Sequence, residues 1–212
     1  MSSSATPLSP LNLRRTALVI IDLQDDFLAP EGAYARGGAV SAAAQALPPR
    51  VAAVAQALKA AGGMVVGSQF TLWPDAQGEP MISPHLKTLR PFLRRGDFAP
   101  GSAGQAMVSD IAPWVDVAVC KVAYSAFFNT QLDWVLRRAG IDTVAVCGIV
   151  TNGGVASTVR DAHMRDYRTL VLSDGCAAFR QEVHDTALAD MGTVAQVLTC
   201  NDFTAALAAG TP

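Results

Sequence analysis

The sequence is poor in charged residues and has no strong excess of either sign. Asp, Glu, Lys and Arg together make up only 16% of the 212 residues, and the formal net charge is −2. Proteins whose main partner is nucleic acid or an anionic membrane usually carry a basic excess, so we expect neither partner here. Half of the residues are hydrophobic, which is enough to form an ordered core in one compact domain.

Long apolar runs are absent as well. None reaches the roughly 18 residues that a transmembrane helix requires. The chain starts with MSSSATPLSP, which is rich in Ser and Pro and contains no apolar core of a secretion signal. We therefore predict a flexible tail over residues 1–14, a single domain over residues 15–212, and a cytoplasmic location.

Cysteine and histidine are few, and their spacing is not that of a metal site or a redox motif. No two of the four cysteines form a C-x-x-C pair, and most lie in or beside apolar runs, which is typical of buried reduced thiols. The three histidines show no ligand spacing with one another or with acidic residues. The sequence thus predicts neither a bound metal nor another cofactor.

Short apolar runs that alternate with amphipathic stretches are what the sequence does contain. Six runs rich in valine lie at residues 16–22, 64–70, 115–121, 142–148, 168–174 and 193–199. They are continuous rather than alternating, as expected of strands buried on both faces of a parallel sheet. Residues 48–63 and 129–140, between such runs, carry apolar side chains at helical spacing. This pattern predicts an α/β fold, a three-layer α/β/α domain with a six-stranded parallel sheet.

Two segments interrupt the alternation of strands and helices. Residues 71–84 and 96–104 are rich in Pro and Gly. Long loops in a compact domain are often lids or binding loops, and an ordinary surface connection is the alternative. The sequence alone leaves both interpretations open.

Polar residues and a glycine turn follow three of the predicted strands. Asp22 ends the first run, Lys121 ends the third, and the fourth runs into the glycine-containing turn of residues 148–154. In an open parallel sheet, ligands bind outside the carboxyl ends of the strands. A carboxylate and an ammonium in a partly desolvated crevice are costly unless they are paired or used. We therefore predict a functional site at this edge.

Three segments carry a resemblance to a known family. VIIDLQDDF (19–27), KVAYSAF (121–127) and CGIVTNGGVASTVRDA (147–162), in this order, resemble the motif blocks of the isochorismatase-like hydrolase superfamily. The resemblance implies a Rossmann-like six-stranded sheet, a small-molecule substrate and a homo-oligomer, either a dimer or a tetramer. Most members are cysteine hydrolases of small amides that use an aspartate, a lysine and a cysteine.

The motif positions assign a role to each candidate residue. Asp22 takes the aspartate position and Lys121 the lysine position, but the cysteine position falls on Gly154. Hydrolysis through a thioester needs a sulfur at that place, and this sequence has none. The resemblance also implies that the backbone amides of Val150 and Gly154 form an oxyanion hole, and that the Ile149–Val150 peptide bond is cis.

Three hypotheses follow from the glycine. The first is vinyl-ether hydrolysis of a small carboxylated substrate, because true isochorismatases also carry glycine there and form no acyl-enzyme. Asp22 would then protonate the enol carbon and Lys121 would position the substrate. The second is an amidase-type (C–N) frame whose nucleophile is replaced by Gly154, naturally or by engineering. It is supported by the stretch IDLQ (21–24), where isochorismatases usually read H-D-M-Q. The third is binding of a small molecule without turnover.

The walls of the pocket can also be proposed from the sequence. Phe27, Tyr124 and Phe127 lie within the motif blocks, and the resemblance implies that Gln69 and Trp73 sit where the family lines its pocket. All five are candidate substrate-binding residues. Core packing is the alternative for each aromatic residue. The aspartate and two histidines that bind metal in nicotinamidases are absent after the second predicted strand, which again predicts a site without metal.

Overall fold

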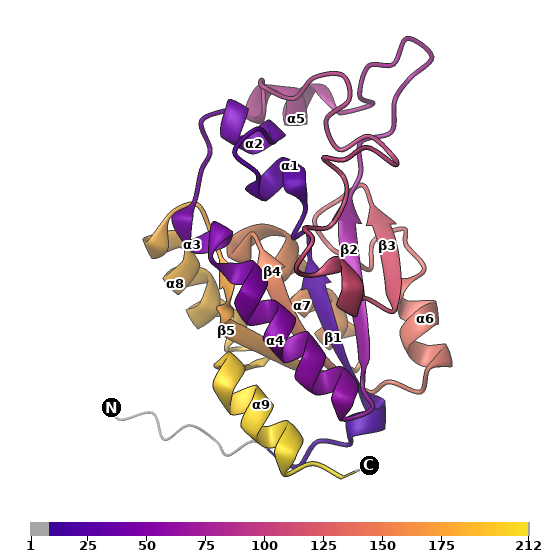
Figure 1. The fold of residues 1–212 in the computed structure, drawn as a ribbon, viewed down its shortest axis with the longest axis vertical. Helices are drawn as coiled ribbons and strands as arrows, with labels where there is room; N and C mark the ends of the chain where they lie inside the picture. The colour runs from indigo at the N-terminus through magenta and orange to yellow at the C-terminus, as the bar shows by residue number, and fades with distance from the viewer. Residues whose placement is uncertain (1–8, 212) are drawn as a thin grey trace.

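The computed structural model describes residues 9–211 of the chain (Figure 1). Its strands are β1 (Thr16–Ile21), β2 (Met64–Phe70), β3 (Val117–Lys121), β4 (Thr143–Ile149), β5 (Arg168–Ala177) and β6 (Gln196–Leu198). Its α-helices are α1 (Asp25–Leu28), α2 (Ala33–Arg36), α3 (Ala42–Gln45), α4 (Leu47–Ala60), α5 (Pro84–Leu89), α6 (Leu132–Arg138), α7 (Ala156–Met164), α8 (Gln181–Met191) and α9 (Cys200–Ala208). Shorter helical turns are η1 (Leu13–Arg15), η2 (Ala112–Trp114) and η3 (Thr151–Val155).

The six strands form one parallel sheet in the order β3-β2-β1-β4-β5-β6. Every residue of β1 and of β4 is buried, as expected of central strands covered on both faces. Helices α4 and α9 pack together on one face, whereas α7 lies on the other face beside α8 (Figure 1). The predicted three-layer α/β/α fold with a six-stranded parallel sheet is confirmed. β5 continues three residues past the predicted strand, and β6 is shorter than predicted.

The predicted tail lies partly outside the described residues, which begin at residue 9. In its described part, Leu11 and Leu13 are buried in the main core. The first and last described segments lie side by side, because Asn12 forms a parallel β-bridge with Thr211. Leu11 and Leu13 therefore belong to the core of the domain, although the prediction assigns them to the tail. None of the described helices is both long and apolar enough to cross a bilayer.

The two Pro/Gly-rich segments contribute to a second, smaller core beyond the carboxyl ends of the strands. Its buried members are Ala33, Tyr34, Leu72, Leu93 and Phe98. Figure 1 shows α1, α2 and α5 together at this end of the molecule, above the tips of the β1 and β2 arrows. The two segments thus help to cover the edge of the sheet at which the sequence places a site.

Asp26 holds this small core together. Its carboxylate is buried and accepts hydrogen bonds from the backbone N–H groups of Ala33 (3.1 Å) and Phe98 (2.6 Å). A single side chain of α1 therefore joins α2 to the loop of residues 96–104. Gly104 is required beside it, since a Cβ there would lie only 2.2 Å from Asp26 Oδ2.

Candidate active site

Asp22 is fixed at the carboxyl end of β1. Its backbone has a φ of 53°, in the left-handed region that aspartate tolerates better than most residues. Its N–H donates to the Ser68 carbonyl (3.2 Å), and its Oδ1 accepts a 2.7 Å hydrogen bond from the Ser68 hydroxyl. The residue is 3% exposed, so the carboxylate has a single well-defined orientation.

Lys121 ends β3 and reaches across the edge of the sheet to Asp22. Its Nζ lies 2.6 Å from Asp22 Oδ2 and donates a second hydrogen bond to the Ala123 carbonyl (3.0 Å). The ammonium also lies 5.5 Å from the ring centroid of Phe70, a cation–π contact. The pair is almost fully buried, with side-chain exposures of 2% for Lys121 and 4% for Asp22.

Burial raises the pKa of Asp22 above its ordinary value of 3.8, although Lys121 and the Ser68 hydroxyl act in the opposite direction. Desolvation is the largest of these effects because the carboxyl is removed from water. A carboxyl with a raised pKa in a cavity is suited to take part in proton transfer.

The turn after β4 brings backbone groups to the same place. The Ile149–Val150 peptide bond is cis, and the Val150 carbonyl accepts hydrogen bonds from the N–H groups of Gly153 (2.9 Å) and Val155 (3.3 Å). Gly148, which precedes the turn, has a φ of 111°, and a Cβ there would lie 2.2 Å from a backbone oxygen of β1. Only glycine fits this position, because strand β1 and the turn approach each other so closely.

Gly154 faces Asp22. A Cβ at this position would lie 3.4 Å from Asp22 Oδ2 and 2.8 Å from Cγ2 of Ile21. The hydroxyl of Thr158 on α7 donates to the Gly154 carbonyl (2.7 Å) and accepts from the Ala126 N–H (3.0 Å), which ties the turn to the segment after Lys121. The position that carries the nucleophilic cysteine in the motif is therefore beside the carboxylate, with no side chain of its own.

The cysteines of this chain do not replace the missing nucleophile. None of the four is among the described residues that line the cavity. Cys147 lies closest in sequence, but it is fully buried within β4, and desolvation raises the pKa of its thiol well above the ordinary value. A thiol that stays protonated and inaccessible cannot act as a nucleophile.

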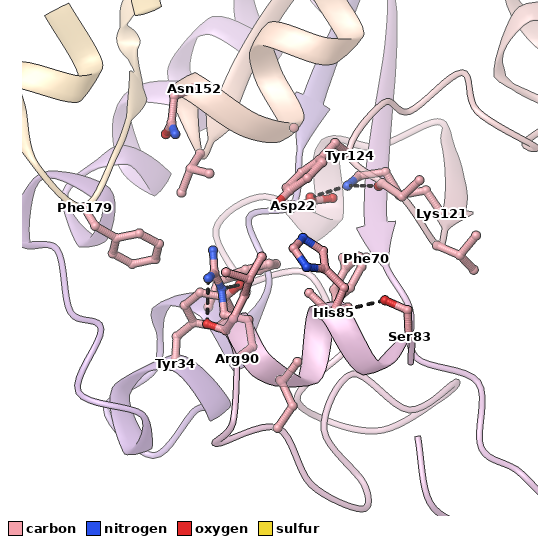
Figure 2. Close-up of a pocket in the computed structure, with 18 residues that line it drawn as sticks. Asp22, Tyr34, Phe70, Ser83, His85, Arg90, Lys121, Tyr124, Asn152 and Phe179 are labelled. Carbon is pink, nitrogen blue, oxygen red and sulfur yellow. Dashed lines mark hydrogen bonds and ion pairs between the residues drawn. The ribbon is translucent and has the colours of Figure 1, made fainter. Parts of the chain in front are cut away.

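Asp22, Lys121 and the turn border one cavity of about 340 Å³ (Figure 2). This volume lies within the roughly 300–1,000 Å³ range of small-molecule sites. The described lining residues are Asp22, Phe27, Tyr34, Phe70, Ser83, His85, Leu86, Leu89, Arg90, Leu93, Lys121, Val122, Ala123, Tyr124, Val150, Asn152, Gly154 and Phe179. Most of these side chains are apolar, and the ion pair of Asp22 and Lys121 lies at one side of the cavity.

The structure places six of the nine candidate residues at this cavity and three elsewhere. Asp22, Lys121, Val150, Gly154, Phe27 and Tyr124 line it. Gln69 does not, because it alternates in β2 with Ser68 and Phe70 and donates instead to the Gln105 carbonyl (3.0 Å). Trp73 is 49% exposed, on the loop after β2. Phe127 is a core residue that stacks on Tyr167, with ring centroids 5.9 Å apart.

Several lining residues were not predicted from the sequence. Tyr34, Arg90 and Phe179 come from three distant segments, and helix α5 adds His85, Leu86 and Leu89. The sequence signal for α5 is the unusually long Pro/Gly-rich connection of residues 71–84, for which a binding loop is one of the two interpretations. No spacing or motif in the sequence pointed to Arg90.

The described residues offer no candidate metal site. Nowhere in residues 9–211 do three or more His, Cys, Asp or Glu side chains gather in a way that could hold a metal ion. The acidic group at the cavity, Asp22, is already bonded to Lys121 and Ser68.

The fold and the site define a class of protein: a Rossmann-like α/β enzyme with a buried aspartate–lysine pair beside a tight turn at the carboxyl edge of its sheet. The family model described as "Isochorismatase domain" matches residues 16–202. The chain therefore belongs to the isochorismatase family and is an isochorismatase-like hydrolase.

Curated relatives and solved structures are consistent with this family. The chain is 35% identical to ureidoacrylate amidohydrolase RutB of Azorhizobium caulinodans over 178 residues, which cover 79% of this chain and 78% of the relative. Another relative of that name, from Caulobacter vibrioides, is 34% identical over 198 residues, covering 82% and 83%. A cysteine hydrolase from Pseudomonas syringae pv. phaseolicola superposes with a TM-score of 0.84 at 27% identity, covering 99% of both chains. N-carbamoylsarcosine amidase from Thermoplasma acidophilum gives a TM-score of 0.69, also at 27% identity, covering 88% of this chain and 97% of that one.

Proposed function

We propose that the protein hydrolyses a carbon–nitrogen bond in a small amide or ureido acid, with water instead of a cysteine thiol as the attacking group. The observation that carries this proposal is the 3.4 Å separation between Asp22 Oδ2 and the Cβ position of Gly154. The carboxylate thereby faces the place from which the family's nucleophile would attack. Relatives named as amidohydrolases support the carbon–nitrogen bond as the target.

The first step is the attack of water on the carbonyl carbon. Ionised Asp22 removes a proton from a water molecule in the cavity as the water oxygen forms its bond to that carbon. The raised pKa of Asp22 brings the carboxyl nearer to the range in which a general base works best. Lys121 keeps a share of the carboxyl ionised through its ion pair.

The second step is the release of the nitrogen. The backbone N–H groups of Val150 and Gly154 stabilise the negative charge that develops on the carbonyl oxygen, as an oxyanion hole. When the tetrahedral intermediate collapses, the carbon–nitrogen bond breaks and Asp22 returns its proton to the leaving nitrogen. The reaction consumes one water and needs no covalent intermediate.

Vinyl-ether hydrolysis, the reaction predicted first from the sequence, is the second candidate. It is favoured by the raised pKa of Asp22, because a carboxyl that holds its proton can protonate an enol carbon. The named amidohydrolase relatives favour the carbon–nitrogen bond over this reaction.

A substrate panel tested across pH separates the two candidates. Ureidoacrylate, N-carbamoylsarcosine, simple primary amides and isochorismate are incubated with the protein, and ammonia release and organic products are measured. The general-base reaction needs ionised Asp22, so kcat/KM rises with pH through a limb above 3.8, the ordinary value for the pKa of this carboxyl. The acid reaction needs protonated Asp22, and its kcat/KM falls as pH rises through the same limb.

Two variants test whether the activity depends on Asp22. Asp22→Asn removes the base and is expected to lower amide hydrolysis by about 100-fold or more, in the range usual for general acid–base groups. Asp25→Asn changes a partly buried neighbour outside the cavity lining and keeps the rate. Turnover of isochorismate alone would replace the proposal with the second candidate. No turnover of any compound would leave binding without catalysis.

A further inference from the structure

An arginine and a lysine side chain line the described part of the cavity, and only one of the two is paired with an acidic group. The ammonium of Lys121 is neutralised by Asp22 at 2.6 Å. Arg90 has no acidic partner among the ion pairs of the described residues. The cavity therefore keeps one uncompensated positive charge from its arginine and lysine side chains.

Arg90 is held in place by neutral groups. Its Nε donates to the Tyr34 hydroxyl (3.3 Å), and its Nη1 donates to the Leu89 carbonyl (2.9 Å). A guanidinium has five N–H donors, so these two bonds leave others for a ligand. The side chain is half-buried, which strengthens its attraction for an anion compared with a fully solvated arginine.

Aromatic side chains line the same cavity as Arg90. Tyr34 stacks on Phe179 with ring centroids 5.4 Å apart and planes 7° from parallel, and Phe27 packs against Tyr34 at 4.5 Å. Phe70 lies further along the same wall, 6.2 Å from Phe27. Figure 2 shows Arg90, Tyr34 and Phe179 on one side of the cavity and the Asp22–Lys121 pair on the other. The cavity therefore offers aromatic surface as well as two polar ends.

We propose that Arg90 is a specificity-determining residue that binds the carboxylate of the substrate, and that the substrate is an aryl-bearing carboxylic acid. Tyr34 positions the guanidinium, and the rings of Phe27, Phe70 and Phe179 accommodate the aryl group. The amide or ureido group of the same molecule would then reach Asp22. The last point rests on the proposed function, whereas binding of the acid does not.

Binding of compounds that cannot be hydrolysed tests the proposal. The probes are 3-phenylpropionate, its neutral isostere 4-phenyl-2-butanone, and butanoate, which lacks the ring; binding to the full chain is measured by titration calorimetry. Charge-assisted hydrogen bonds to a guanidinium predict that the acid binds about 10-fold to 100-fold tighter than the ketone. Loss of the ring predicts that butanoate binds at least about 10-fold weaker than 3-phenylpropionate.

The variants assign the preference to Arg90. Arg90→Gln is expected to remove the preference for the acid and to keep binding of the ketone, which also shows that the variant is folded. Arg94→Gln is the matched control, since Arg94 is exposed and does not line the cavity. Tyr34→Phe retains the ring and loses the hydroxyl that orients Arg90, so it weakens binding of the acid by a few-fold only.

Defined outcomes overturn the inference. Equal affinity of the native protein for acid and ketone, an acid preference that survives in Arg90→Gln, equal binding of butanoate, or no binding of any probe would each do so. Because no probe contains a scissile bond, these results are independent of turnover. Binding as expected without hydrolysis of any amide, aryl-bearing ureido acids included, would instead refute the proposed function and leave Arg90 as the carboxylate-binding residue.

Discussion

Restoring a thiol at Gly154 examines whether the site keeps the geometry of an amidase. The backbone of Gly154 does not have a φ in the left-handed region, so a side chain is allowed there. In Gly154→Cys, the Cβ would lie 3.4 Å from Asp22 Oδ2, which places the introduced sulfur within reach of a base. The start of helix α7 and the Lys121 ammonium would both favour the thiolate.

The substitution also has a steric consequence. The new Cβ would lie 2.8 Å from Cγ2 of Ile21, a methyl group of the central strand that cannot move freely. Overpacking of this kind costs about 1–3 kcal/mol, and the lower entropy of the unfolded chain offsets roughly 0.4–1 kcal/mol of it. We expect a net loss of about 1–2 kcal/mol in the free energy of unfolding, which leaves a typical domain folded.

The expected gain in rate is much larger than this loss in stability. Removing the nucleophile of a serine hydrolase lowers kcat by roughly 10⁶, so adding one to an intact frame should raise amide hydrolysis by at least about 100-fold. The assay is ammonia release from ureidoacrylate and primary amides, with intact-mass detection of an acyl-enzyme. The activity of Gly154→Cys should be lost on treatment with iodoacetamide. That of the native protein should persist, because no cysteine is among the described residues that line its cavity.

Gly154→Ala is the matched control, since it introduces the same Cβ without a sulfur. It should show the same loss of stability as Gly154→Cys and no gain in activity. The reasoning would be refuted if Gly154→Cys were folded and alkylated by iodoacetamide but hydrolysed no amide faster than Gly154→Ala. Such a result would mean that the turn no longer supports acyl transfer, and slowed isochorismate turnover in both variants would point to vinyl-ether chemistry.

Three further substitutions test the supports of the site. Lys121→Met removes the ammonium that favours ionised Asp22, so the pKa of this carboxyl should rise further and the acidic limb of kcat/KM should move to higher pH. An unchanged pH profile would contradict the pairing of Lys121 with Asp22. Asp26→Asn weakens the bonds to two backbone N–H groups and should cost about 1–3 kcal/mol in urea denaturation, with Asp25→Asn as the control. Gly148→Ala places a Cβ within 2.2 Å of a β1 carbonyl oxygen and should lower the free energy of unfolding by about 3 kcal/mol or more, measured as a large drop in Tm. A native-like Tm would show that the turn can relax.

Two of the three candidates that lie away from the cavity, Gln69 and Phe127, differ from the prediction in the direction of their side chains. Gln69 lies one residue from Ser68 and Phe70, both of which face the site, and a strand turns alternate side chains to opposite faces. The prediction places Phe127 at the pocket because it follows Lys121 closely, but its side chain packs in the core against Tyr167. Closeness along the chain to residues of the site therefore does not determine the direction of a side chain.

The sequence by itself determined the fold class and the centre of the site. Valine-rich runs that alternate with helical periodicity are sufficient for a parallel sheet, and the carboxyl ends of parallel strands meet at one edge. Asp22, Lys121 and the glycine turn could thus be brought together without coordinates, because each lies at the carboxyl end of a strand.

Only the tertiary structure decided what surrounds that centre. Arg90, Tyr34 and Phe179 are far apart in the sequence and meet because the small core around Phe98, held by the Asp26 carboxylate, folds the loops over the sheet. The path of such loops depends on long-range packing and on single buried hydrogen bonds, and no local periodicity records it. The catalytic groups at the sheet edge can therefore be predicted from the sequence, whereas the selection of a ligand depends on contacts that form only in the folded chain.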